Sequence, residues 1–288
     1  MVTRLLIAGL FCLSTSNLSA GLLYSIDVDS DELVTINTTT GEVSVIGSLG
    51  QNVIRSDLTL LGSDLFSLEF VNSSAINLHT INPLTGMIVN TVAVSLAGTT
   101  IVNAEGLARV GNQLKISYGV SNPTVSDTIG DLSLTGVISN TQQFNGIDFD
   151  SLGVGDGDVL YNADSFGLFG NTADDVIYRT LDTSTNILDT VYSEENSGVN
   201  GLGVDVVSLG GFLFSTGVRA SDSKDVLRVV DIAGGAVHAD IELSRDGSYQ
   251  GLARVVSTVP EPSSLALLGM GVAGLGGYRW RRKRHQAA

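Results

Sequence analysis

Cysteine, histidine and tryptophan are nearly absent from this chain of 288 residues, and each shortage excludes a kind of chemistry. The single cysteine, Cys12, lies in an apolar leader that we expect to be removed. The mature chain then forms no disulfide and has no thiolate for zinc, an iron–sulfur cluster or nucleophilic attack. Between residues 21 and 258 the only imidazoles are His79 and His238, which are far apart in sequence. We expect each to be an exposed strand residue rather than a ligand.

Basic residues are also scarce in the body of the chain. Residues 21–259 carry nine Lys and Arg against 29 Asp and Glu. Such a surface repels phosphate backbones, so nucleic acid is not an expected partner. The excess of acid is typical of a soluble secreted domain, and a cation-binding role is the alternative.

The N-terminus has the pattern of a signal peptide over residues 1–20. Arg4 supplies the positive charge, residues 5–13 form an apolar run, and Leu18-Ser19-Ala20 is a plausible cleavage site. The run is too short for a permanent spanning helix. We therefore expect residues 21–258 to be an exported domain.

The C-terminus, residues 259–288, contains three parts in a fixed order. Pro260, Glu261 and Pro262 come first, and an apolar, Gly-rich run predicted as a short transmembrane helix over residues 264–278 follows. A basic end resists crossing the membrane and acts as a stop. Its charged residues are Arg279, Arg281, Arg282, Lys283 and Arg284. An ordinary single-pass anchor is the alternative.

This order and spacing resemble the PEP-CTERM sorting signal, which an exosortase, a membrane transpeptidase, recognises. The resemblance implies that Pro260, Glu261 and Pro262 are the recognition residues and that exosortase and the membrane are partners. It also implies a Gram-negative bacterium that makes exopolysaccharide and biofilm, in which the protein passes through the inner membrane to the cell surface or extracellular matrix. The resemblance covers about a tenth of the chain and does not indicate the fold of the exported domain.

An internal repeat predicts that fold. Residues 33–41, LVTINTTTG, recur as LHTINPLTG at residues 78–86, and weaker copies begin near residues 128, 178 and 227. Each copy alternates apolar and polar residues, then has Asn or Asp and a Gly or Asn, which is typical of a strand entering a hairpin. A second motif precedes these copies, and residues 106–110 and 251–255 are both GLARV.

A period of 45–50 residues with four strands per unit is typical of β-propeller blades. We predict an all-β, five-bladed propeller closed by residues 251–256, which join the blade of residues 22–49. The other blades are expected at residues 57–98, 106–143, 146–199 and 201–246. A β-sandwich or a solenoid is the alternative.

No catalytic motif is found, and no catalytic residue or cofactor is predicted. A polar residue precedes each Gly-Leu or Gly-Ile run of the second motif. If these runs are the inner strands, Glu105, Asn145, Asn200 and Gln250 surround one mouth of the channel. Their oxygens could bind calcium or the hydroxyls of a sugar, although polar residues also begin strands at a solvated rim.

Three functions remain open from the sequence. The first is a non-enzymatic envelope or matrix protein that binds or scaffolds extracellular polysaccharide. The second is a calcium-dependent hydrolase that uses the channel mouth, since the site faintly resembles the metal site of lactonase-type propellers. The third is an inert secreted domain. The shortage of His and Lys favours the first over the second.

Overall fold

The computed structural model describes most of the exported domain. The described residues are 21–53, 56–72, 75–98, 101–120, 126–145, 147, 149–165, 175–185, 187–195, 197–202 and 205–255. All of them belong to the first of two compact units, Met1–Val255 and Val256–Ala288. The predicted signal peptide, the transmembrane helix and the sorting residues lie outside the described residues.

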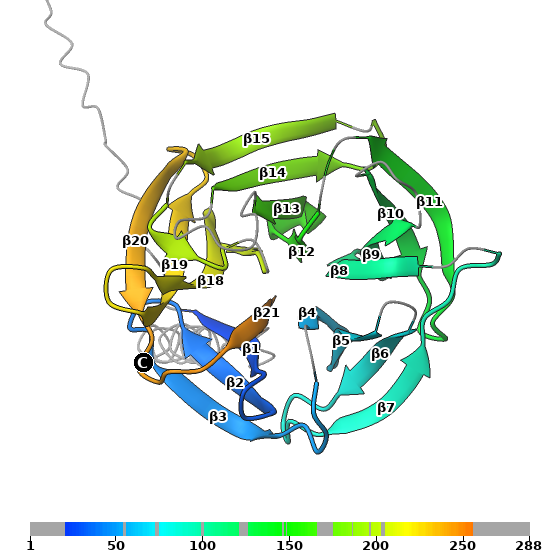
Figure 1. Cartoon of the computed structure of the whole chain (residues 1–288), viewed down its shortest axis with the longest axis horizontal. Helices are drawn as coiled ribbons and strands as arrows, with labels where there is room; N and C mark the ends of the chain where they lie inside the picture. The colour runs from blue at the N-terminus through cyan, green and yellow to red at the C-terminus, as the bar shows by residue number, and fades with distance from the viewer. Residues whose placement is uncertain are drawn as a thin grey trace, which may run out of the picture. The chain divides into compact units, whose positions relative to one another are not determined.

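Five antiparallel sheets surround a common centre (Figure 1). The first contains β1 (Leu22–Asp27), β2 (Glu32–Asn37), β3 (Val43–Ser48) and β21 (Tyr249–Arg254). The second contains β4 (Ser56–Leu61), β5 (Asp64–Asn72), β6 (Ala75–Ile81) and β7 (Ile88–Ala93). The third contains β8 (Ile101–Val110), β9 (Gln113–Val120), β10 (Ser126–Leu132) and β11 (Ile138–Asn145).

The remaining two sheets come from the second half of the chain. The fourth contains β12 (Ser151–Val154), β13 (Leu160–Ser165), β14 (Val176–Asp182) and β15 (Ile187–Glu194), with the short 3-10 helix η1 (Asp156–Asp158) between its first two strands. The fifth contains β16 (Val199–Asn200), β17 (Val207–Leu209), β18 (Phe212–Arg219), β19 (Lys224–Asp231) and β20 (Ala236–Glu242). The prediction of an all-β chain with five propeller blades is confirmed.

The repeated hairpin joins the two outer strands of each sheet. In the first copy Asn37 Oδ1 accepts hydrogen bonds from the backbone N–H groups of Thr39 (2.9 Å) and Thr40 (3.1 Å). Gly41 then adopts a φ of 70°, which few other residues adopt without strain. Asn82 and Asp231 make the same kind of bond in their copies. The repeat is therefore a turn motif, as its composition predicts.

The hydrophobic core consists of clusters that lie between neighbouring sheets. Leu23 and Val34 of the first sheet, for example, pack with Phe212, Phe214 and Leu227 of the fifth. Another cluster joins the second and third sheets through Leu68, Leu78 and Tyr118 among others. Three further clusters join the other neighbouring pairs. Each sheet therefore buries both of its faces against its two neighbours.

The C-terminal strand β21 pairs antiparallel with β1 of the first sheet. Leu23 lies opposite Arg254 and Asp27 lies opposite Tyr249, with a register shift between Tyr24 and Ile26. The strand begins two residues earlier than predicted, because Tyr249 and Gln250 already pair with β1. The first sheet is thus built from both ends of the exported domain.

Two of the predicted inner strands differ from the structure. Gly146-Ile147 precedes rather than begins the inner strand of the fourth sheet, since β12 starts at Ser151. Gly201-Leu202 interrupts the inner edge of the fifth sheet, where β16 and β17 each pair with β18. In the fifth sheet Gly201 and Leu202 form a turn after β16, and a motif match alone does not show which residues pair.

The prediction that His79 is exposed is wrong. Its side chain is fully buried in β6, where Nε2 lies 3.0 Å from Glu69 Oε2 and Nδ1 lies 2.9 Å from Thr91 Oγ1. The neighbouring strands β5 and β7 supply these partners, so the cost of burying the ring is offset. His238 is exposed, as predicted.

Candidate functional site: the centre and a pocket beside β21

One buried carboxylate joins three sheets at the centre of the ring. Asp57 lies on the inner strand β4, and its Oδ2 accepts hydrogen bonds from Leu107 N of β8 (2.7 Å) and Leu152 N of β12 (3.3 Å). Its Oδ1 accepts a bond from Leu58 N at 2.7 Å. Burial raises the pKa of Asp57 well above its ordinary value, and these backbone donors oppose the shift. This role was not predicted from the sequence.

The glycines of the two GLARV segments allow the inner strands to approach closely. A Cβ atom at Gly106 would lie 2.5 Å from Leu152 N and 2.6 Å from Ser117 Oγ. A Cβ atom at Gly251 would lie 2.7 Å from Leu58 N. Both distances are too short for a side chain, so the repeated Gly keeps neighbouring inner strands in backbone contact.

Gly106→Ala is expected to lower the free energy of unfolding by about 2–3 kcal/mol, because the added methyl group overlaps the backbone of β12. Urea unfolding followed by circular dichroism measures this loss. Gly234→Ala is the matched control, since its Cβ would meet only the flexible side chain of Asp231, at 3.0 Å. Equal midpoints for the two variants would contradict the steric explanation.

The arginines of the same two segments both reach η1, which follows β12. Arg109 Nη2 lies 3.3 Å from Asp158 Oδ1, and Arg254 Nη1 lies 2.7 Å from Asp156 Oδ1. Arg254 Nε also donates to the carbonyl oxygen of Ser208 at 2.5 Å. The pentapeptide is therefore repeated because its Gly and its Arg each contact a neighbouring sheet.

A pocket of about 270 Å³ lies between the fifth sheet and the segment that leads into β21. Its side chains offer two amides, two hydroxyls, one carboxylate and the apolar surfaces of a valine and a tyrosine. The lining residues are Asn200, Gly201, Thr216, Gly217, Val218, Asp225, Gly247, Ser248, Tyr249 and Gln250. This volume is at the lower end of the range for small-molecule sites.

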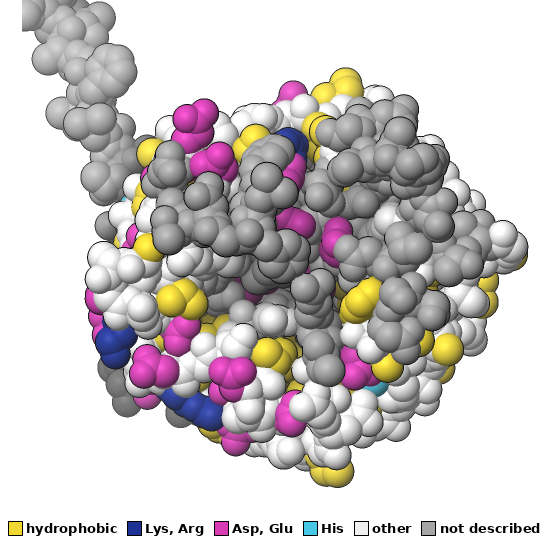
Figure 2. Space-filling view, viewed as in Figure 1, with side chains coloured by type: hydrophobic (Ala, Val, Ile, Leu, Met, Phe, Trp, Pro, Cys, Tyr) yellow, Lys and Arg dark blue, Asp and Glu magenta, His cyan; other side chains and the backbone are white. Residues whose placement is uncertain are grey.

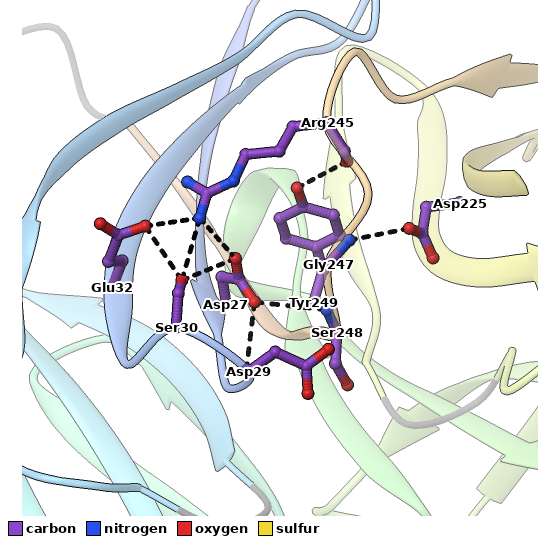
Figure 3. A network of polar contacts seen from close by, with 9 residues as sticks. All are labelled: Asp27, Asp29, Ser30, Glu32, Asp225, Arg245, Gly247, Ser248 and Tyr249. Carbon is purple, nitrogen blue, oxygen red and sulfur yellow. Dashed lines mark hydrogen bonds and ion pairs between the residues drawn. The ribbon is translucent and has the colours of Figure 1, made fainter.

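Hydrogen bonds and ion pairs hold the rim of this pocket in place (Figure 3). Arg245 Nη2 lies 2.7 Å from Glu32 Oε2 and 3.2 Å from Asp27 Oδ2 on the β1–β2 hairpin. The Tyr249 hydroxyl donates to the carbonyl oxygen of Arg245 at 2.8 Å, and Gly247 N donates to Asp225 Oδ2 at 2.9 Å. The segment of residues 245–249 is thus joined to the first sheet and to the fifth.

A second buried carboxylate, Asp205, lies directly beneath the pocket. Thr216, a pocket residue, donates its N–H to Asp205 Oδ1 at 2.8 Å and brings its Oγ1 within 2.5 Å of Oδ2. Thr216 Oγ1 also lies 3.0 Å from the carbonyl oxygen of Tyr249. Burial raises the pKa of Asp205 from 3.8 to about 7, and the bonds from Thr216 and Ser215 reduce the shift.

The structure brings together two of the four residues predicted at the channel mouth. Asn200, at the end of β16, and Gln250, in β21, both line the pocket. Glu105 lies in β8 beside a register shift, and Asn145 ends β11, the outermost strand of the third sheet. Neither lines the pocket, so a ligand site formed by all four stays a prediction.

The electrostatic character of the described surface is acidic, and Figure 2 shows many more Asp and Glu than Lys and Arg side chains on the face in view. Asp27, Asp29 and Asp246 all raise the pKa of Asp225 through their charge, although burial is the larger cause. Within the described residues no group of three or more His, Cys, Asp or Glu is arranged to hold a metal ion.

The ring of five sheets, four with four strands and one with five, defines a β-propeller protein. Residues 258–283 match the PEP-CTERM protein-sorting motif, so the chain is a propeller protein carrying the signal that the Pro-Glu-Pro pattern predicts. The motif marks it as an exported protein that exosortase recognises and sorts to the cell envelope.

Solved structures share the fold at low sequence identity. An endo-1,4-beta-xylanase from Bacteroides thetaiotaomicron is 11% identical, covers 81% of this chain and 92% of its own, and has a TM-score of 0.50. A chain from a nidogen/laminin complex is 14% identical, covers 82% and 81%, and has a TM-score of 0.49. At such identities the likeness concerns the fold alone. No curated protein matches the chain.

Within the part of the chain that the structure describes, no helix is long and apolar enough to cross a bilayer.

Proposed function

We propose that the chain is a non-enzymatic binding or scaffolding protein of the extracellular polysaccharide layer, displayed by a Gram-negative bacterium after exosortase has processed its tail. The observation that carries this proposal is the sorting motif at residues 258–283, attached to a propeller that has a pocket lined by residues of two sheets.

In this proposal the C-terminal segment holds the chain at the membrane until exosortase recognises it. The segment of residues 264–278 forms a short helix that holds the chain in the inner membrane, and the basic end stops its passage. Exosortase then recognises Pro260, Glu261 and Pro262. Because β21 ends at Arg254, before the sorting segment begins in the sequence, cleavage near residue 260 leaves its pairing with β1 intact.

Sorting is tested by fractionation of the producing bacterium. A tagged full-length chain is expected at the cell surface or in the matrix, whereas a chain that lacks residues 259–288 stays in the periplasm because its signal peptide alone directs export. Glu261→Ala, which keeps the apolar run, is expected to accumulate uncut in the inner membrane. Glu195→Ala is the matched control. Identical distribution of all four chains would refute exosortase sorting.

Polysaccharide binding is tested with the full-length chain in detergent and the purified extracellular polysaccharide of the same organism. We expect co-sedimentation that exceeds that of an acidic control protein of similar net charge. Because the exported domain has 29 acidic and nine basic residues, retention on a polyuronate should be weaker at low salt than on a neutral polymer. Absence of retention on every polymer would refute the binding role.

A further inference from the structure

The pocket beside β21 has acceptor atoms that lack donors. Asp225 is partly buried, and its Oδ2 accepts one bond, from Gly247 N, while no described residue donates to its Oδ1. Asn200 also lines the pocket, but its amide oxygen, which has no hydrogen-bond partner among the described residues, is too enclosed for a ligand to reach. A carboxylate can accept about four hydrogen bonds, so Asp225 has acceptor capacity left. The pocket therefore favours a ligand that donates hydrogen bonds.

The charge around the pocket restricts that ligand further. Asp27, Asp29 and Asp246 lie close enough to Asp225 to raise its pKa. Two cations near these acids are already paired, Arg245 with Asp27 and Glu32 and Lys224 with Asp246. A carboxylate or phosphate group entering the pocket would be repelled. The ligand should therefore be neutral or positively charged.

The remaining lining selects a neutral ligand with several hydroxyls over a cation. Among the described residues Asp225 is the only carboxylate that lines the pocket, whereas calcium binds through several oxygens that include more than one carboxylate in most sites. The side-chain amides of Asn200 and Gln250 and the hydroxyl of Ser248 each contain both donors and acceptors. Such groups suit the hydroxyls of a ligand, which also donate and accept. Tyr249 and Val218 supply apolar surface for a ring of carbon atoms.

We propose that this pocket binds one neutral sugar ring, with Asp225 accepting hydrogen bonds from its hydroxyls and Gln250 and Asn200 bonding to neighbouring ones. The inference rests on the proposed polysaccharide-binding function and names the part of the domain that performs it. Gly201, Gly217 and Gly247 leave the walls without side chains, so backbone atoms also come within reach of the ring. Figure 3 shows Asp225, Ser248 and Tyr249 at this place.

The inference is tested with the full-length chain in detergent and three probes: methyl β-D-glucopyranoside, sodium glucuronate and calcium chloride. Saturation-transfer NMR and calorimetric titration are expected to show binding of the neutral glycoside with a dissociation constant on the order of 1 mM, as suits a ligand of this size. Glucuronate should bind at least about tenfold more weakly because of its charge.

Two variants assign the binding to the pocket. Asp225→Asn keeps an acceptor for Gly247 N but loses the charge. Gln250→Leu removes an amide group from the pocket. Each substitution is expected to weaken glycoside binding by about tenfold or more. Asp189→Asn and Gln143→Leu are the matched controls on the outer strands β15 and β11. Urea unfolding of every variant shows whether the fold is retained, and if one pocket variant does not fold, the other decides.

The outcomes separate this inference from the proposed function. Retention of the polysaccharide that is unchanged in Asp225→Asn and Gln250→Leu would overturn the pocket assignment and leave the binding role in place. Heat released by calcium chloride alone, and lost in Asp225→Asn, would overturn the sugar assignment in favour of a cation site. Glycoside binding that is lost in the pocket variants and kept in the controls supports the inference.

Discussion

Asp57→Ala is expected to lower the free energy of unfolding by about 3–5 kcal/mol, the largest loss we predict for one side chain of this domain. The substitution leaves Leu107 N and Leu152 N without an acceptor at the centre of the ring, where water does not reach them. Each buried N–H group without a partner costs about 1–3 kcal/mol. The two donors belong to different sheets, so the loss also loosens the packing between blades.

The measurement is urea unfolding at pH 7, with Asp64→Ala as the matched control. Asp64 is an exposed aspartate at the start of β5, and its replacement should change the stability by less than about 0.5 kcal/mol. Asp57→Asn should fall between the two, because the amide keeps one acceptor oxygen but turns an NH₂ group toward an N–H donor. An unfolding midpoint for Asp57→Ala equal to that of the unmodified chain would show that Asp57 does not hold the sheets together.

Asp205→Asn is expected to flatten the pH dependence of stability between about pH 4 and pH 7. Thr216 Oγ1 has one hydrogen but lies near two acceptors, Asp205 Oδ2 at 2.5 Å and the carbonyl oxygen of Tyr249 at 3.0 Å. When Asp205 is ionised, the Thr216 hydroxyl donates to only one of them at a time. When Asp205 is protonated, its carboxyl group can donate to Thr216 while Thr216 donates to Tyr249, so both contacts are hydrogen bonds.

The sign of the effect follows from the direction of the pKa shift. The folded protein raises the pKa of Asp205 from 3.8 to about 7, so it binds this proton more tightly than the unfolded chain does. The stabilisation is complete below pH 3.8 and is lost as the pH rises to about 7. Within that window this one group lowers the free energy of unfolding by about 1 kcal/mol for each pH unit.

Asparagine reproduces the protonated state at every pH, since its NH₂ group donates to Thr216 Oγ1 in place of the carboxyl proton. The stability of Asp205→Asn relative to the unmodified chain should therefore increase as the pH rises from 4 to 7. Asp57 is buried nearby and its pKa is also raised, so it adds its own slope to both proteins. Asp64→Asn is the control. If the free energies of unfolding of Asp205→Asn and the unmodified chain change in parallel between pH 4 and pH 7, Asp205 does not bind a proton in this range.

Local signals in the sequence were sufficient for the blades and their outer hairpins. Asn37 and Gly41 form a turn through bonds within a few residues, and this chemistry depends little on the rest of the chain. The inner strands were harder to predict, because Gly201-Leu202 matches the Gly-Leu motif yet falls in a break between β16 and β17. Whether a Gly-Leu segment forms a regular inner strand depends on the neighbouring sheets and not on its own residues.

The candidate site was predictable only in part, for a similar reason. Asn200 and Gln250 were found because polar residues precede the Gly-Leu runs, and both line the pocket. Asp225 and Thr216 carried no signal, since each lies within a strand and belongs to neither repeated motif. Asp57 and His79 are polar residues whose burial depends on donors and acceptors from other strands.

The sequence by itself determined the export and sorting signal, the all-β class, the five blades and the turns, because each of these depends on residues that lie close together along the chain. The tertiary structure decided which polar groups are buried, why the GLARV segment occurs twice, and where a pocket forms. Those properties depend on atoms brought together from distant strands, such as Asp57 with Leu152 and Thr216 with Tyr249. Hydrogen bonds and close packing between sheets act only once the ring has assembled.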